Sequence, residues 1–196
     1  MAAGTQRFGG RGWRALAPAL TALVTALALA GPAQGHRAHA ARACAHADEL
    51  PAQITTAQAR AAVLCLLNRE RAAHGLRALR GNARLRHAAQ GHSRDMARRH
   101  YFEHDTPDGR TMVDRVRAAG YLHSGRSWTV GENIAWGSGP FATPAHVVDM
   151  WMHSPGHRAN ILRRAYREIG IGIVRDTPVD GVGEGATYTT DFGAIS

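Results

Sequence analysis

The chain has 196 residues, including 24 arginines, no lysine and 15 acidic residues, and its formal net charge is +9. This length suits one domain. The positive charge favours a solvated basic surface, and the alternative is attraction to an anionic surface such as a cell-wall polymer or lipid headgroups. Nucleic acid is not an expected partner, because no stripe of arginines with interleaved aromatic residues is present.

Residues 1–35 are predicted to be a signal peptide that is removed. Three arginines precede an apolar run from Leu20 to Ala30, and Ala33-Gln34-Gly35 has the small residues of a cleavage site. The alternative is a membrane anchor, but even from Ala15 the run has only 16 residues, and a span needs about 20. We therefore expect a secreted, extracellular protein that is not integral to a membrane, with a net charge of +6 after cleavage.

Residues 36–56 are predicted to form a flexible arm that precedes a domain at 57–193. The chain has two cysteines, Cys44 in the arm and Cys65 beyond it. An even number of cysteines in an exported protein favours a disulfide bond. The alternative is a pair of buried free thiols.

Three helices are expected in the first half of the domain. Thr55 or Thr56 can cap a helix that ends at His74-Gly75, and Asn82 opens a second helix. His92 lies on the apolar face of this second helix, where a locally hydrogen-bonded core histidine is expected rather than a ligand. A third helix covers 111–119.

The second half combines loops, a helix and two strands. Residues 121–144 are predicted to be rich in loops, and an apolar helical run after them is stopped by Ser154-Pro155-Gly156. Strict alternation from Glu168 to Val174 predicts a strand, with glycines on one face that allow a neighbour to approach closely. Residues 186–192 predict a second strand, antiparallel to the first. Helices followed by strands indicate an α+β fold.

The strongest candidate site residues are His104, Glu132 and His157. Each is next to turn-forming or strand-breaking residues and is flanked by apolar side chains that can anchor it. Two imidazoles and a carboxylate can bind Zn²⁺ or another divalent metal, or can perform acid–base chemistry. The alternative is a buried hydrogen-bonded cluster that only shapes the loops.

Several ordered motifs resemble the CAP superfamily, which contains cysteine-rich secretory, antigen 5 and pathogenesis-related proteins. The motifs are His100-Tyr-Phe-Glu-His104, Gly131-Glu-Asn-Ile-Ala-Trp136, Trp151-Met-His-Ser-Pro-Gly-His-Arg-Ala-Asn-Ile-Leu162, Ile169-Gly-Ile-Gly172 and Tyr188-Thr-Thr-Asp-Phe-Gly193. The chain is most similar to the bacterial secreted branch with its SCP domain. The resemblance implies a three-layer α/β/α sandwich, in which a small antiparallel sheet lies between helices and a large cleft opens on one side.

The family cleft commonly carries two histidines and two glutamates, and His104, Glu132 and His157 match three of these. The second glutamate should follow Trp151 closely, but it is absent here, and His153 is a possible substitute ligand. The resemblance implies an extracellular binding module for a lipid or sterol, an envelope polymer or a protein.

The alternative function is a metal-assisted hydrolase of peptide or cell-wall substrates. In that reading Glu132 is the base and the histidines hold the metal. No serine nucleophile motif is present. The pentapeptide from His100 to His104 also fits an inverted zinc-protease motif, but Asp105-Thr-Pro-Asp-Gly109 ends the helix that such a motif requires.

Overall fold

The computed structural model describes residues 43–196. The predicted signal peptide and the first part of the predicted arm lie outside these residues. No helix in the described part is long and apolar enough to cross a membrane.

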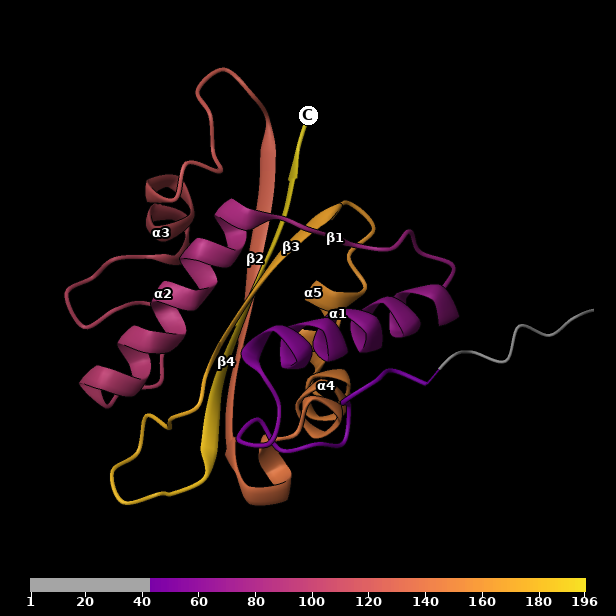
Figure 1. The fold of residues 1–196 in the computed structure, drawn as a ribbon. Coiled ribbons are helices and arrows are strands. Elements are labelled where there is room, and N and C mark those ends of the chain that lie inside the picture. The colour runs from indigo at the N-terminus through magenta and orange to yellow at the C-terminus, as the bar shows by residue number, and fades with distance from the viewer. Residues whose placement is uncertain (1–42) are drawn as a thin grey trace, which may run out of the picture. The chain divides into compact units, whose positions relative to one another are not determined.

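The domain is an α/β/α sandwich, as Figure 1 shows. Helices α1, α4 and α5 cover one face of a four-stranded sheet, and α2 and α3 cover the other. The helices are α1 (Thr56–Ala73), α2 (Ala83–Arg99), α3 (Met112–Ala118), the 3₁₀ helix η1 (Gly139–Ala142), α4 (Pro144–His153) and α5 (Pro155–Ile161). The predicted α+β class and three-layer arrangement are confirmed.

The sheet has the strand order β1-β3-β4-β2. Its strands are β1 (Arg80–Gly81), β2 (Trp128–Ser138), β3 (Glu168–Val174) and β4 (Gly185–Ile195). Strand β4 pairs antiparallel with both β3 and β2, as predicted for β3, whereas the short β1 pairs parallel with β3. The last strand in the sequence therefore lies inside the sheet.

One expectation was wrong. The region 121–144 contains β2, an 11-residue strand, rather than mainly loops. This strand carries Glu132 and pairs along its whole length with β4. Its pattern hides it, because five consecutive residues of β2, 131–135, are buried on both faces and polar and apolar residues do not alternate.

The helix ends follow the expected capping chemistry. Thr55 forms a capping box with Gln58, and the side chain of Asn82 accepts hydrogen bonds from the first turn of α2. Ser154 ends α4, and Pro155 opens α5 at the first helical position, where proline is tolerated. The predicted break is thus a junction between two helices.

The core is densest where helices meet the sheet. Trp151 is fully buried, and its Nε1–H donates to the carbonyl oxygen of Ile134 at 3.0 Å. On the opposite face, Gly170 and Gly172 let α2 approach the strand closely: a Cβ at these positions would lie 2.0 Å from the carbonyl carbon of Leu85 and 2.3 Å from that of Ala89. The expectation that these glycines permit close packing is confirmed.

A disulfide bond joins Cys44 to Cys65 on α1, as predicted. Residues 43–55 form turns rather than a helix or strand. They nevertheless bury Cys44, Ala47 and Ile54, and the carbonyl oxygen of Ala47 accepts a hydrogen bond from the N–H of Ala145.

Candidate functional site

Glu132 is the centre of the candidate site. Its side chain is only 2% exposed, and both carboxylate oxygens are engaged. The Nδ1–H of His104 donates to Oε1 at 2.9 Å, and Nη2 of Arg115 donates to Oε2 at 2.7 Å. Burial alone would raise the pKa of Glu132, but the His104 hydrogen bond and the charge of Arg115 outweigh it and lower that pKa. Glu132 is therefore ionised and held at both oxygens.

Arg115 was not predicted as part of this site. It projects from α3, is 7% exposed, and also donates from Nη1 to the carbonyl oxygen of Arg110 at 3.2 Å. An arginine on a short helix looks like an ordinary solvent-exposed charge in the sequence. Its role becomes apparent only when α3 packs beside the start of β2 and supplies the charge that the buried carboxylate requires.

His92 is a buried core histidine, as expected. Its Nε2 pairs with the carbonyl oxygen of Glu103 at 3.0 Å, and its ring lies close to that of Tyr101. Its Nε2 also lies 3.9 Å from Oε1 of Glu132. Burial lowers the pKa of His92 despite the nearby carboxylate. The neutral form of the imidazole is therefore favoured next to Glu132.

Asp191 is a second carboxyl group that the sequence did not reveal. It lies on β4 directly opposite Glu132 in the strand register, is fully buried, and has no donor to either oxygen within residues 43–196. Burial and the charge of Glu132 raise the pKa of Asp191 well above its usual range. The environment thus favours the neutral form of Asp191 and the ionised form of Glu132.

His104 presents the exposed imidazole of the site. It follows the end of α2, where His100 adopts the left-handed conformation and turns the chain away. The side chain of His104 is 54% exposed although its Nδ1 is bound by Glu132. That hydrogen bond raises the pKa of His104. The carboxylate therefore orients the ring and favours its charged form.

His157 approaches the site through main-chain contacts. Its carbonyl oxygen accepts from the Nδ2 of Asn133 at 3.1 Å, and Nδ2 of Asn160 donates to the carbonyl oxygen of Glu132 at 3.0 Å. These bonds fix α5 against β2. The Nδ1 of His157 is buried and has no partner among the described residues. Burial lowers the pKa of His157, and the nearby charge of His104 adds to this effect.

The structure therefore unites the three predicted residues only in part. His104 and Glu132 are in direct contact, while His157 shares no hydrogen bond or ion pair with Glu132 in the described part of the chain. The predicted anchoring role of Trp151 agrees with its buried indole, whose ring centroid lies 6.4 Å from that of His157.

Glu132 has no oxygen free for a divalent metal in this arrangement. Within residues 43–196, no three histidine, cysteine, aspartate or glutamate side chains are grouped closely enough to hold one. Both oxygens of Glu132 are engaged, one by a guanidinium that repels a cation, and Nδ1 of His104 is occupied. The zinc site stays a prediction to be tested by titration.

The two alternative histidines lie away from the cluster. His153 is 78% exposed, and its Nδ1 pairs with the carbonyl oxygen of Asp149 at 2.9 Å. His100 pairs with Asp180 at 3.1 Å after α2 has ended at Arg99. The inverted zinc-protease motif therefore lacks the continuous helix that it needs.

A cavity of about 260 Å³ lies behind the cluster, between α2 and α3. His92 and Arg115 contribute to its lining, whereas His104 and His157 do not. Two charged pairs at Arg99, with Asp95 and Asp108, border it. The exposed imidazole of His104 therefore does not line this cavity.

Comparison with known proteins identifies the class to which this fold and site belong. The model of the CAP family, the cysteine-rich secretory protein family, matches residues 64–190. This match covers more than half of the chain, so the chain belongs to the CAP family.

Individual relatives are bacterial. The chain is 38% identical over 112 residues to the uncharacterised protein YkwD of Bacillus subtilis, and the match covers 57% of this chain and 41% of that protein. An extracellular protein of Bacillus anthracis with an SCP domain is 26% identical with a TM-score of 0.56, over 71% of this chain and 43% of the other.

A third similarity concerns the fold alone. An outer surface protein of Borrelia burgdorferi superposes with a TM-score of 0.61 at 17% identity, covering 73% of this chain and 97% of that protein. The chain spans less than half of the YkwD and Bacillus anthracis proteins. Their remaining segments have no counterpart in these matches.

Proposed function

We propose that this chain is a secreted binding module that holds an anionic group of a cell-envelope polymer at His104. The observation that carries the proposal is the contrast between His104, 54% exposed, and Glu132, 2% exposed with both oxygens bound. The carboxylate acts as a fixed support, and the imidazole that it orients and charges is the group left to meet a ligand. The basic net charge of the chain favours the same class of ligand.

Secretion is part of this proposal. The predicted signal peptide, the disulfide bond between Cys44 and Cys65, and the extracellular or outer-surface descriptions of two structural relatives support it. Lipid, sterol and protein ligands, which the family resemblance also implies, are alternatives that the same binding experiment can include.

The test is a titration of the purified protein with poly(glycerol phosphate), using uncharged dextran as the control polymer. We expect His104→Gln to weaken binding about tenfold, which corresponds to roughly 1.4 kcal/mol, because a charge-assisted contact is lost. His153→Gln removes an exposed imidazole outside the cluster and should bind like the wild type. Equal binding by wild type and His104→Gln, or equal binding of dextran, would contradict the proposal.

A zinc titration separates this proposal from a metal site. If Zn²⁺ binds with one-to-one stoichiometry and His104→Gln and His157→Gln abolish it, the cluster rearranges to hold a metal. We expect no such binding while Arg115 occupies Glu132. The titration reports on the metal alone, so it does not depend on the identity of the polymer.

A hydrolase is the second candidate, because the contact between His104 and Glu132 resembles the histidine–carboxylate pairs of general bases. The geometry would make His104 the base, not Glu132 as the sequence suggested, since Glu132 has no free oxygen. The nucleophile would be water, as both cysteines are in the disulfide. Turnover of peptidoglycan or peptide that is lost in His104→Gln but kept in His153→Gln would support this function.

A further inference from the structure

The outer edge of β3 carries an unfilled pairing position. Alternate residues of a strand direct their main-chain N–H and C=O groups to the same side. The carbonyl oxygen of Ile169 accepts the N–H of Asn82 at 2.8 Å, and both main-chain groups of Ile173 pair with the side-chain amide of Gln90 at 3.1 Å. These residues thus face away from β4, and so does Ile171 between them.

Ile171 has no pairing partner on that side in the described part of the chain. Strand β1 ends at Gly81, opposite Ile169, and Gln90 covers only Ile173. No hydrogen bond to the outward N–H or C=O of Ile171 is present within residues 43–196. Ile171 is only 5% exposed, and main-chain polar groups in such positions are normally paired. The N–H and C=O of Ile171 are therefore one donor and one acceptor that the C=O and N–H of one incoming residue could pair with.

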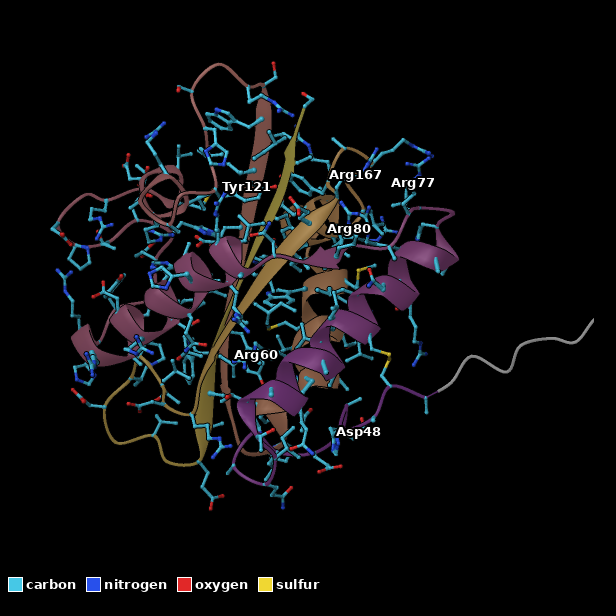
Figure 2. All side chains as sticks on the ribbon, turned by 45° about the horizontal axis from the view of Figure 1, so that its top comes forward. Asp48, Arg60, Arg77, Arg80, Tyr121 and Arg167 are labelled. Atoms are coloured by element: carbon cyan, nitrogen blue, oxygen red, sulfur yellow. A yellow bond between two sulfur atoms is a disulfide. The ribbon has the colours of Figure 1, made fainter. Side chains whose placement is uncertain are left out.

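A groove of about 360 Å³ opens at this position, between α1 and α2. Ala61 and Leu64 on α1 form an apolar wall. Arg60 and Arg86 also line it, and Figure 2 shows Arg60 on α1 beside the sheet. A second hollow of about 390 Å³ shares both arginines and extends the groove along α2.

The two arginines have no acidic counter-ion among residues 43–196. Neither Arg60 nor Arg86 forms an ion pair with an acidic side chain in the described part of the chain. Burial, and then the charge of Arg86, lower the pKa of Arg60, so the guanidinium groups are close enough to repel each other. A carboxylate between them would relieve this repulsion and could accept from both.

We propose that this groove binds an extended peptide in which an apolar residue is next to an acidic one. The main-chain N–H and C=O of the apolar residue pair with the C=O and N–H of Ile171, and its side chain packs on Leu64. The carboxylate of the acidic residue lies between Arg60 and Arg86. The side chain of Gln90 shows that an amide fits this edge, because it makes the same two bonds two residues further along β3, at Ile173.

This site is separate from the His104 cluster. The groove lies at the β1–β3 edge of the sheet, whereas Glu132 lies on β2 at the opposite edge. Loss of peptide binding would leave the proposed function untouched, and His104→Gln should not alter the groove.

The test uses the peptide acetyl-Ala-Val-Glu-Ala-amide and the ¹⁵N-labelled protein. We expect the amide signal of Ile171 to shift and its hydrogen exchange to slow at least tenfold on binding, because its N–H gains a partner. A peptide with N-methyl valine loses the donor, and one with glutamine in place of glutamate loses the charge. Each should bind about tenfold more weakly.

Matched protein variants separate the site from general charge attraction. Arg60→Gln with Arg86→Gln should weaken binding about tenfold. Arg94→Gln with Arg98→Gln removes two exposed charges elsewhere on α2 and should change it little. Ala61→Phe fills the apolar wall and should also weaken binding.

Four outcomes would overturn the proposal. The first is an Ile171 amide signal that does not shift at millimolar peptide, and the second is an N-methyl peptide that binds as tightly as the parent peptide. The third is an equal loss of peptide affinity in the Arg60/Arg86 and the Arg94/Arg98 double variants. The fourth is a shift of the Ile171 signal with decanoate that equals the shift with the peptide. Decanoate offers a carboxylate and an apolar chain but no amide, so the last result would indicate a simple amphiphile site. An unresponsive amide would mean that water alone satisfies this edge.

Discussion

At the scale of single residues, the candidate site depends on charge compensation around one buried carboxylate. Glu132 can be ionised inside the protein because Arg115 and His104 bind its two oxygens, while Asp191 opposite it stays neutral. A buried charge that loses its partner is costly, whereas an exposed one is not. Substitutions around Glu132 should therefore act mainly on stability when they are inside the cluster and mainly on binding when they are at its exposed rim.

Arg115→Met should lower the free energy of unfolding by about 3–5 kcal/mol, because it leaves the buried Glu132 charge without its guanidinium. Urea denaturation of both proteins measures this change. Arg117→Met, two positions further on α3 and largely exposed in its pair with Asp114, should change the value by less than about 0.5 kcal/mol. Similar losses in both variants would show that Arg115 has no special role.

The pH dependence of stability should identify His104. Its hydrogen bond to Glu132 raises its pKa in the folded state, so the folded protein binds the proton more tightly than the unfolded chain. The stabilisation is complete below the unfolded pKa of about 6.5 and is lost as the pH rises through the folded value. The difference in unfolding free energy between wild type and His104→Gln should shrink over that window. A difference that stays constant from acid to alkaline pH would contradict the hydrogen-bonded pair.

Asp191→Asn tests the neutral carboxyl. An amide is close in shape to a protonated carboxyl group and also carries no charge, so we expect this variant to fold with nearly unchanged stability. Asp191→Leu places an apolar side chain opposite the ionised Glu132 and should be clearly less stable. Strong destabilisation by asparagine would mean that Asp191 is ionised.

At the scale of elements, close contact between α2 and β3 positions both the His104–Glu132 cluster and the groove at Ile171. Gly172→Ala should destabilise the protein by about 1–3 kcal/mol, since its new Cβ would overlap the main chain at Ala89. Gly91→Ala in the middle of α2 has free space around the new methyl group and should stabilise by about 0.5–1 kcal/mol. Thermal unfolding of the two variants should therefore shift in opposite directions.

Local patterns predicted those elements whose signals are local. Capping at Thr55 and Asn82, the break at Pro155 and the alternation of β3 all follow from neighbouring residues. Strand β2 did not follow, because Glu132 and Asn133 are poor strand formers that are held in the strand by contacts on both faces.

The predicted site was incomplete for a related reason. Motif spacing revealed His104, Glu132 and His157, but Arg115 and Asp191 join them only through packing of α3 and through strand register. In the sequence, Asp191 is an acidic residue within a segment that otherwise fits a strand. Its burial could not be predicted, because that depends on β4 lying between two other strands.

At the scale of the whole molecule, the disulfide bond ties the segment before the domain to α1. It spans 21 positions, and closing a loop of that size should contribute about 3 kcal/mol in the chain-entropy model. The double variant Cys44→Ser with Cys65→Ser should be less stable by this amount in denaturant. Reduction of the wild type should give the same loss, and an unchanged midpoint in either case would show that packing of Cys44 and Ala47 is sufficient.

The place of β4 between β3 and β2 also determines the order in which the domain can form. The two longer strands that are synthesised earlier, β2 and β3, do not pair with each other, because the strand that pairs with both is β4. Until Gly185–Ile195 emerges, neither the Glu132–Asp191 contact nor most of the sheet can exist. A chain with such long-range pairing folds more slowly than one built from local contacts, so the Glu132–Asp191 contact should be among the last parts of the domain to form.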